Sequence, residues 1–242
     1  MVPLGEAPWS VEPFGGVIAD GKLYGRGSSD MKGGVAAFVR AALELARRDR
    51  RRSDLVLVIA AGEETGCEGS RHVAEAAGLG DVGAIVVAEP TSNQPLLGHR
   101  GALWLRGIAR GRTAHGAMPQ HGVNAIYKAA SAVTRLAAVE LGSEQDSLLG
   151  SATLNVGTFR GGINLNSVPD LAEFTIDIRS LPGQDHRHLL RLIEDCVGPD
   201  IALERVIDLP GVMTAADHPW IQGVYEVVVP FLGEGPEKAG AR

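Results

Sequence analysis

The sequence predicts an α/β fold with a separate α+β domain inserted into it. Glycine and proline are frequent, with 32 and 13 residues, while Phe, Tyr and Trp make up only 5% of the chain. This composition indicates frequent turns and a core of aliphatic side chains, as is typical of α/β proteins. Two continuous apolar runs of strand length begin at Asp54 and Asp81, and such runs are typical of parallel strands covered on both faces. After about residue 98 the pattern changes to alternating strands and striped helices.

The composition argues against several classes of protein. With 242 residues, of which 45% are hydrophobic and 21% charged, the chain can bury a core. Its net charge of −6 opposes binding to nucleic acid, whose phosphates attract basic proteins. Cys67 and Cys196 are too few and too distant for a disulfide framework or a cysteine-ligated zinc site, which suits a cytoplasmic protein. The sequence has no apolar run of the about 18 residues that a membrane span needs, and no secretion signal at its start.

The first part of the chain predicts a hairpin, a helix and two strands. Residues 16–30 indicate two short extended pieces around a turn at 20–21, followed by a glycine-rich loop that ends in Asp30. Residues 33–48 carry apolar side chains at helical spacing. The two apolar runs come next, and each ends in acidic residues, which are Glu63, Glu64 and Glu89. Because ligands of α/β sheets bind beyond the carboxyl ends of the strands, these acids mark the expected site.

The second part of the chain predicts a ferredoxin-like domain. A strand, an apolar-striped helix, two strands, a helix and a last strand follow one another at 102–110, 122–141, 151–162, 170–180, 185–197 and 201–209. The order β-α-β-β-α-β is that of a compact ferredoxin-like unit. We place this unit at residues 98–207, inserted into a first domain that comprises residues 1–97 and 208–242.

The grouped acids predict a metal site. Asp30, Glu63, Glu64 and Glu89 would repel one another at the mouth of a sheet unless a cation neutralised them. Oxygen ligands of this kind suit Zn²⁺, Co²⁺ or Mn²⁺, and a bridging carboxylate could hold two ions about 3.5–4 Å apart. Of the adjacent pair, one could bind metal while the other takes a proton from water. The alternatives are that each acid is a solvated loop residue, and that Asp30 is only a helix N-cap.

Four motifs in this order resemble one known family. The segments GRGSSDMKGG, AAGEETGCEGS, VVAEPT and TAHGAMPQHGVNAI are similar to those of the metal-dependent amidohydrolases and exopeptidases that include acetylornithine deacetylase, succinyl-diaminopimelate desuccinylase, aminoacylase and the glutamate carboxypeptidases. The resemblance implies a zinc-exopeptidase-like sheet domain in which Asp30 bridges two metals and Glu63 is the general base. Glu64 and Glu89 would each bind one metal, and two zinc ions are the expected cofactor, with cobalt or manganese as alternatives.

The resemblance also extends to the inserted domain, which is similar to the family's lid and dimerisation domain. It implies a homodimer in which His115 reaches the active site of the opposite subunit and polarises the substrate carbonyl. Asn166 in GGINLNSVPD would lie at a substrate position, and Arg179 in TIDIRS would hold a free carboxylate of the small-molecule substrate. The alternatives are that Arg179 balances Asp177, that Asn166 is a turn residue and that His115 is a loop histidine.

Two of the family's motifs are expected to be missing. The family opens with His-x-Asp before Val-Pro and closes with a glycine-rich motif and a metal-binding His, whereas this sequence runs from Met1-Val2-Pro3 to Arg242. We therefore expect an incomplete catalytic domain with three carboxylate ligands and no imidazole, which weakens zinc binding. The sequence thus predicts a metal-dependent hydrolase of amide bonds in N-acyl amino acids or small peptides, inactive as the chain stands. The alternative is a non-catalytic dimerising or ligand-binding remnant of that family.

Overall fold

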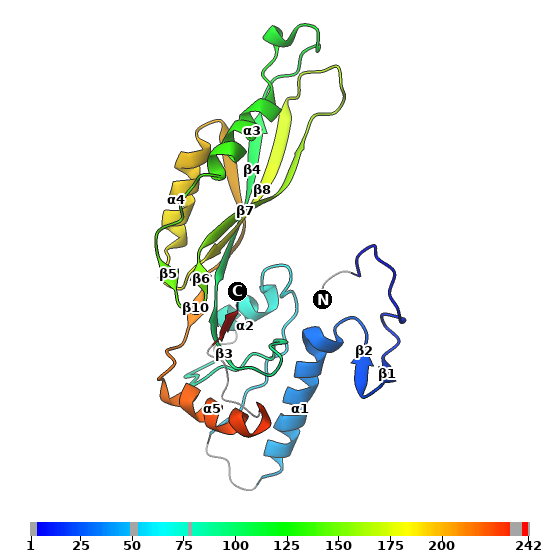
Figure 1. Cartoon of the computed structure of the whole chain (residues 1–242), viewed down its shortest axis with the longest axis vertical. Coiled ribbons are helices and arrows are strands. Elements are labelled where there is room, and N and C mark those ends of the chain that lie inside the picture. Colours follow the sequence, from blue (N-terminus) through cyan, green and yellow to red (C-terminus); the bar gives the residue numbers. More distant parts are fainter. Residues whose placement is uncertain (1–3, 49–52, 77–78, 233–238, 242) are drawn as a thin grey trace. The chain divides into compact units, whose positions relative to one another are not determined.

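The chain divides into two compact units, residues 1–93 and 94–242. The computed structural model describes residues 4–48, 53–76, 79–232 and 239–241 (Figure 1). The second unit contains the whole segment predicted to form the inserted domain, together with the residues that follow it. The predicted return of residues 208–242 to the first domain stays a prediction.

The second unit is built on a four-stranded antiparallel sheet with the order β7-β8-β4-β9. Along the chain its elements are β4 (Gly101–Arg110), α3 (Ala125–Leu136), β7 (Thr153–Gly161), β8 (Leu171–Ser180), α4 (His186–Val197) and β9 (Ile201–Leu209). Figure 1 shows α3 and α4 on the same face of this sheet. The order β-α-β-β-α-β and the strand order confirm the predicted ferredoxin-like architecture.

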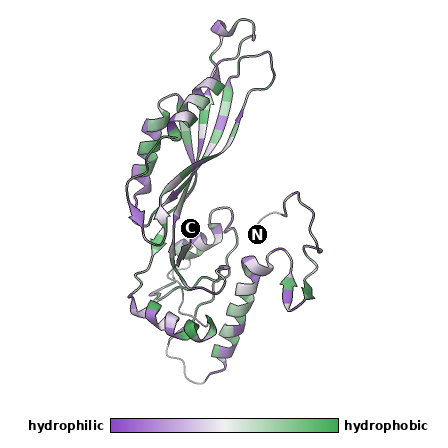
Figure 2. Ribbon diagram, viewed as in Figure 1, coloured by the Kyte–Doolittle hydropathy of each residue, from purple (hydrophilic) through white to green (hydrophobic). Residues whose placement is uncertain are grey.

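One face of this sheet forms the core, and none of the described helices covers the other face. Along β8, buried residues alternate with partly exposed ones, because successive side chains of a strand point to opposite faces, and Figure 2 shows the matching change in hydropathy along the strands. The buried residues of β4 and β8 pack against α3 and α4, and the largest of them are Phe174, Leu103, Leu105, Ile176 and Ile178. The uncovered face carries Trp104, Asp177 and Arg179, which are partly exposed.

The two helices that pack on this sheet, α3 and α4, each begin at a capping side chain. The Asn124 side-chain oxygen accepts hydrogen bonds from the backbone N–H groups of Ile126 and Tyr127 at 2.9 and 3.2 Å. The Asp185 carboxylate accepts one from the backbone N–H of Arg187 at 2.9 Å. These side chains satisfy amide groups that the first turn of a helix leaves without partners.

The capping carboxylate of α4 predicts a dependence of stability on pH. The hydrogen bond from the backbone of Arg187, and after it the Arg187 side chain, hold the pKa of Asp185 below its ordinary value of 3.8. A lowered folded-state pKa adds stability above the ordinary value, and this stability is lost as the pH falls through the folded-state pKa. We therefore expect the wild type to unfold at higher urea than Asp185→Asn near neutral pH, and the two midpoints to converge in acid. A difference that stays constant down to acid pH would contradict this assignment.

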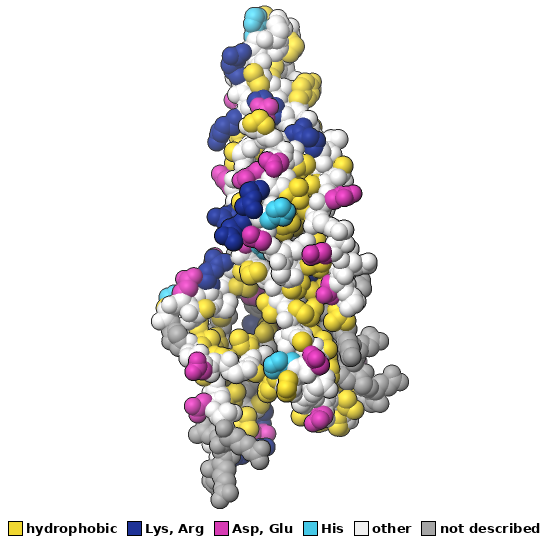
Figure 3. Space-filling view, turned by 90° about the vertical axis from the view of Figure 1, so that its left-hand side faces the viewer, with side chains coloured by type: hydrophobic (Ala, Val, Ile, Leu, Met, Phe, Trp, Pro, Cys, Tyr) yellow, Lys and Arg dark blue, Asp and Glu magenta, His cyan; other side chains and the backbone are white. Residues whose placement is uncertain are grey.

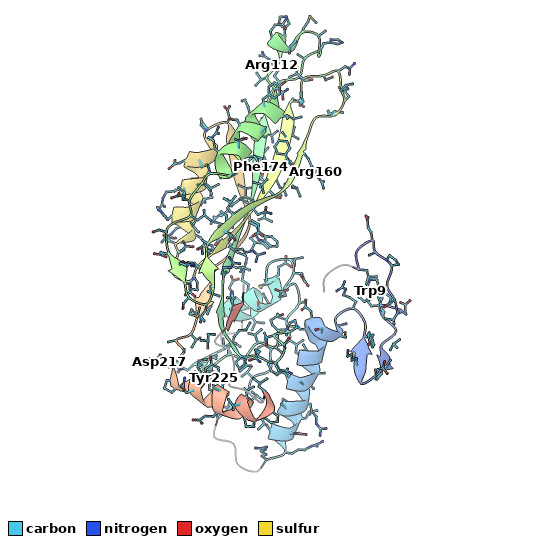
Figure 4. The ribbon with its side chains drawn as sticks, in the orientation of Figure 1. Trp9, Arg112, Arg160, Phe174, Asp217 and Tyr225 are labelled. Carbon is cyan, nitrogen blue, oxygen red and sulfur yellow. The ribbon has the colours of Figure 1, made fainter. Side chains whose placement is uncertain are left out.

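The rest of the second unit consists of short strands and one long helix. A three-stranded sheet has the order β10-β3-β11, formed by β10 (Val212–Met213), β3 (Leu96–His99) and β11 (Ala239–Ala241), and β5 (Gln145–Asp146) pairs with β6 (Gly150–Ser151). The helix α5 (Pro219–Leu232) carries Tyr225 (Figure 4). Within the described part of the chain, the buried Tyr225 hydroxyl has no hydrogen-bond partner. Its burial raises the pKa of the phenol, because a phenolate would lose solvation.

The first unit begins as predicted, with a hairpin and a helix. The strands β1 (Val17–Ala19) and β2 (Lys22–Tyr24) pair around a turn in which Asp20 and Gly21 have φ angles of 51° and 73°. Two left-handed residues in succession are typical of the tight hairpin turns whose twist matches the flanking strands. A short π-helical turn, η1 (Ser28–Lys32), then leads into α1 (Gly33–Ala46), and α2 (Glu68–Ala76) follows later in the chain.

The two strands predicted from the apolar runs are not formed. Residues 54–60 and 84–90 have no regular secondary structure. Their side chains are exposed, with Ile59 at 64% and Ile85 at 72% relative accessibility, and Figure 3 shows hydrophobic side chains reaching the surface. A parallel strand needs a neighbour to pair its backbone groups, and in the described part of the first unit the only paired strands are β1 and β2. The prediction of these two strands from apolar runs alone was therefore wrong.

None of the described helices combines enough residues with enough apolar character to cross a bilayer.

Candidate active site

Asp30 lies at the junction between η1 and α1. Its backbone leaves the helical conformation, with φ −111° and ψ 101°, and the peptide bond to Met31 is cis. The N-cap position of α1 is occupied by Lys32 and has no side-chain capping bond. Asp30 therefore does not act as the cap of this helix, which was the alternative role.

Close packing brings α1 beside the segment that ends in Glu89. A Cβ atom added at Gly34 would lie 2.4 Å from the carbonyl oxygen of Ala88, which is closer than non-bonded atoms can approach. Only glycine therefore fits at this position without movement of one segment. The contact places the beginning of α1, and with it Asp30, near Glu89.

The adjacent pair Glu63 and Glu64 lies in a turn that is fixed to the start of α2. Gly62 adopts a φ of 76°, a conformation that glycine adopts at little cost. The Glu63 carbonyl accepts hydrogen bonds from the backbone N–H groups of Gly66 and Cys67 at 3.0 and 3.1 Å, and the Gly69 N–H donates to the Ala61 carbonyl at 2.9 Å. The backbone of this turn is thus held at both ends, while both glutamate side chains are exposed.

Asp30, Glu63 and Glu64 all lie within electrostatic reach of Glu89. The pKa of Glu89 is raised, first by partial loss of solvation and then by the negative charges of Asp30, Glu63 and Glu64. Like charges that approach each other disfavour the ionised form. The structure therefore brings together the acidic positions that the sequence singled out. A proton or a cation bound there would relieve their repulsion.

These acids do not by themselves form a metal-binding group. Among the residues that the structure describes, no group of three or more His, Cys, Asp or Glu side chains is arranged to hold a metal ion. The donor set is also all carboxylate, whereas catalytic zinc sites in proteins normally include imidazole ligands. The described residues thus do not by themselves complete a site for a divalent ion, and the structure supports no reaction step through one.

His115 and Asn166 lie together near the start of β8. The backbone N–H of Gly116 donates to the Asn166 carbonyl oxygen at 2.7 Å, and His115 pairs with Ser167 in an isolated bridge. Both side chains are exposed. The Ala117 N–H donates to Nδ1 of His115 at 3.2 Å, so in the neutral imidazole the proton lies on Nε2. His115 can therefore donate a hydrogen bond to an acceptor outside the loop.

Arg179 lies near the opposite end of β8, on the uncovered face of the sheet. Its Nε lies 2.9 Å from Oδ1 of Asp177, and its guanidinium carbon lies 5.6 Å from the centroid of the Trp104 ring. Arg179 thus forms the ion pair with Asp177 that its alternative, charge-balancing role requires. Arg179 is not next to His115 and Asn166 in this unit, because the length of β8 separates them.

Sequence reasoning assigned no role to His186, which the structure places in a buried polar chain. Its Nε2 lies 2.7 Å from the Ser180 hydroxyl, and its Nδ1 lies 2.7 Å from Oδ1 of Asp208. This connectivity is that of a serine hydrolase triad. However, the relative accessibility of Ser180 is 0%, so a substrate cannot reach its hydroxyl. The hydrogen-bonded chain of Ser180, His186 and Asp208 therefore stabilises the fold of the domain.

Comparisons with known proteins support the resemblance seen in the motifs. Residues 97–202 match the family model described as the peptidase dimerisation domain, and residues 16–89 match peptidase family M28. A probable succinyl-diaminopimelate desuccinylase of Staphylococcus epidermidis is 30% identical over an alignment of 259 positions, with 93% of this chain and 63% of that protein covered. The chain thus spans somewhat less than two thirds of the length of this curated relative.

Solved structures share the fold at lower identity. Aminopeptidase PepT from Bacillus cereus is 22% identical with a TM-score of 0.65, covering 93% of this chain and 61% of that one. An M20 family metallo-carboxypeptidase from Sulfolobus solfataricus is 15% identical with a TM-score of 0.68, covering 97% of this chain and 68% of that one. The chain is therefore similar to metal-dependent amidohydrolases and exopeptidases, the proteins that its motifs resemble, and residues 97–202 match the model of a peptidase dimerisation domain.

Proposed function

We propose that this protein is a metal-dependent hydrolase that cleaves amide bonds in N-acyl amino acids or small peptides. The observation that carries the proposal is the approach of Asp30, Glu63 and Glu64 to Glu89, from three segments that each match a motif of the family. A carboxyl whose pKa is raised by burial and by neighbouring negative charges, as that of Glu89 is, is typical of catalytic sites. The name of the relative, probable succinyl-diaminopimelate desuccinylase, agrees with this substrate class.

In this proposal the four acids have different tasks. Glu63 is the general base that takes a proton from the attacking water, because its backbone is fixed while its side chain is exposed. Asp30, Glu64 and Glu89 would help to hold a divalent metal, which would supply charge to activate the attacking water. The proposed cofactor is a divalent metal, two zinc ions, with cobalt and manganese competing for the same oxygen donors. Further donors would have to complete this site.

The second unit supplies the groups that we propose to bind the substrate. His115, with its proton on Nε2, and Asn166 would donate hydrogen bonds to the oxyanion that develops from the carbonyl. Arg179 would hold a free carboxylate of the substrate, since a guanidinium pairs with a carboxylate in a two-pronged geometry. The dimerisation domain over residues 97–202 supports a homodimer, in which His115 would act on the site of the other subunit.

The proposal is tested by metal content and hydrolysis together. We expect Asp30→Asn to lower the uptake of Zn²⁺ or Co²⁺ relative to the wild type, while Glu63→Gln takes up as much as the wild type, because Glu63 is not a ligand. Hydrolysis of N-acetyl and N-succinyl amino acids is expected to be slow, since the ligand set is all carboxylate. Glu63→Gln should lower whatever rate is present by about 100-fold or more. Equal rates for Glu63→Gln and the wild type would contradict the role of Glu63.

A second candidate is a non-catalytic protein that dimerises or binds a ligand through the second unit. It is favoured by the finding that no metal-binding group exists among the described residues. The same assays separate the two candidates. Bound divalent metal with hydrolysis that depends on Glu63 excludes this candidate. Carboxylate binding without hydrolysis, in protein that is loaded with metal, supports it.

A further inference from the structure

Three side chains on the uncovered face of the four-stranded sheet form one connected cluster. Asp177 and Arg179 are alternate residues of β8, and Trp104 lies directly opposite Asp177 on β4. Their side chains lie on the same face because residues two apart along a strand point the same way. The cluster is therefore fixed by the register of β4 and β8, which pair along the whole length of both strands.

The Asp177 carboxylate is held in place by Trp104. The indole Nε1 of Trp104 donates a hydrogen bond to Oδ1 of Asp177 at 2.8 Å. The indole N–H is a donor only, and a buried or partly buried indole normally finds such a partner. Oδ1 is the same oxygen that lies 2.9 Å from Nε of Arg179. Oδ1 of Asp177 thus accepts the hydrogen bond of the indole and forms the ion pair with Arg179.

These contacts also orient the guanidinium of Arg179. Asp177 engages its inner nitrogen, Nε, and the face of the Trp104 ring lies 5.6 Å from its central carbon, within the range of a cation–π contact. In the part of the chain that the structure describes, neither terminal amino group of Arg179 has a hydrogen-bond or ion-pair partner. About 40% of the side chain remains exposed. The two terminal amino groups are thus presented together, side by side, as a carboxylate requires.

The geometry points to Asp177 and Trp104 as positioning residues that hold Arg179 ready for the carboxylate of an N-acyl amino acid. This inference rests on the proposed function, in which Arg179 binds the substrate carboxylate. A free arginine side chain loses several rotatable bonds when it binds. An arginine that is already held by its Nε and by an aromatic face loses less freedom, and so binds more tightly. Asp177 would then act on affinity and not on chemistry.

The other ion pair on this sheet provides a matched control. Arg106 on β4 and Glu204 on β9 lie 3.6 Å apart and are about half exposed. Glu204→Ala removes a carboxylate from an arginine of the same sheet, as Asp177→Ala does, but the pair involves no tryptophan. A general effect of net charge on anion binding would change the affinity equally in both variants. Positioning of Arg179 would change it only in Asp177→Ala.

The test uses the indole N–H signals of the isotope-labelled whole chain in NMR. The chain has three tryptophans, and Trp104→Phe identifies the signal of Trp104. We titrate with N-acetylalanine and, separately, with its neutral amide. We expect the Trp104 signal to shift with the carboxylate and not with the amide. Asp177→Ala should weaken this binding about five- to tenfold, while Asp177→Asn, which retains the acceptor for the indole, and Glu204→Ala should stay within about twofold of the wild type.

The outcomes distinguish a failure of this inference from a failure of the proposed function. If Arg179→Gln abolishes the carboxylate-dependent shift while Asp177→Ala binds like the wild type, Arg179 binds the carboxylate without being positioned, and the inference is overturned. If Arg179→Gln binds like the wild type, or the wild type shows no carboxylate-dependent shift, the proposed carboxylate site is itself overturned. A purely structural role of Asp177 would lower the unfolding temperature and leave the affinity unchanged, which also overturns the inference.

Discussion

Replacement of His186 by alanine is expected to lower the free energy of unfolding by about 3 kcal/mol. The imidazole joins the buried Ser180 hydroxyl to Asp208, with 2.7 Å at each end. Its removal leaves the Ser180 hydroxyl, at 0% accessibility, without a partner and opens a cavity at the start of α4. An unsatisfied buried polar group and a cavity each destabilise the folded state. Urea unfolding of the whole chain, followed by circular dichroism, measures the effect.

A second histidine on the same helix provides the control. His188 lies two residues further along α4 and is exposed, so His188→Ala should change the stability by no more than about 0.5 kcal/mol. Equal midpoints for the His186 and His188 variants would contradict the structural role of the polar chain. Labelling of Ser180 by a fluorophosphonate probe in the folded protein would contradict its burial. It would instead indicate a serine nucleophile.

The ferredoxin-like part of the fold could be predicted because its elements carry their own pattern. Strand β8 alternates between buried and partly exposed residues along its whole length, and α4 has its buried residues on one face, at His186, Leu189, Ile193 and Val197. Such amphipathic patterns indicate both the type of element and the side that faces the core. The apolar runs after Asp54 and Asp81 carry no alternation, and whether they form strands depends on neighbours elsewhere. Their sequence alone could not decide this.

The candidate site could be predicted in part for a similar reason. Asp30, Glu63, Glu64 and Glu89 follow local signals, namely a glycine-rich loop and the ends of apolar runs, and the structure brings them together although the expected strands are not formed. His186 offered no such signal, because its partners lie 6 and 22 residues away in the sequence. The contact between Trp104 and Asp177 spans 73 residues. Contacts of this kind depend on strand register, which local sequence does not specify.

Replacement of Phe174 by alanine is expected to have the largest effect of all on stability, a loss of about 3–5 kcal/mol in the free energy of unfolding. Phe174 is the largest fully buried side chain of the chain's described part and lies on the inner face of β8 (Figure 4). Phe159 provides the control, since its ring stacks on that of Phe174 at 6.4 Å but is 41% exposed. Phe159→Ala should lower the free energy of unfolding by about 1 kcal/mol, because Phe159 buries less apolar surface in the folded state than Phe174 does. Similar losses in the two variants would show that Phe174 does not fill the core.

The reason for the size of this effect lies on the neighbouring strand, at Gly107 of β4. A Cβ atom added there would lie 2.4 Å from the Phe174 ring, so the ring fills the space that the glycine leaves open. Gly107→Ala should therefore be destabilised by about 1–3 kcal/mol through overpacking. In the double variant the added methyl group enters the cavity left by Phe174→Ala. The double variant should therefore lose about 1 kcal/mol less free energy of unfolding than the sum of the two single variants. If the losses of unfolding free energy, measured with urea, are strictly additive, the Phe174 ring is not the reason why residue 107 is a glycine. Since β4 also carries Trp104 on its other face, the same packing holds the strand that positions Asp177.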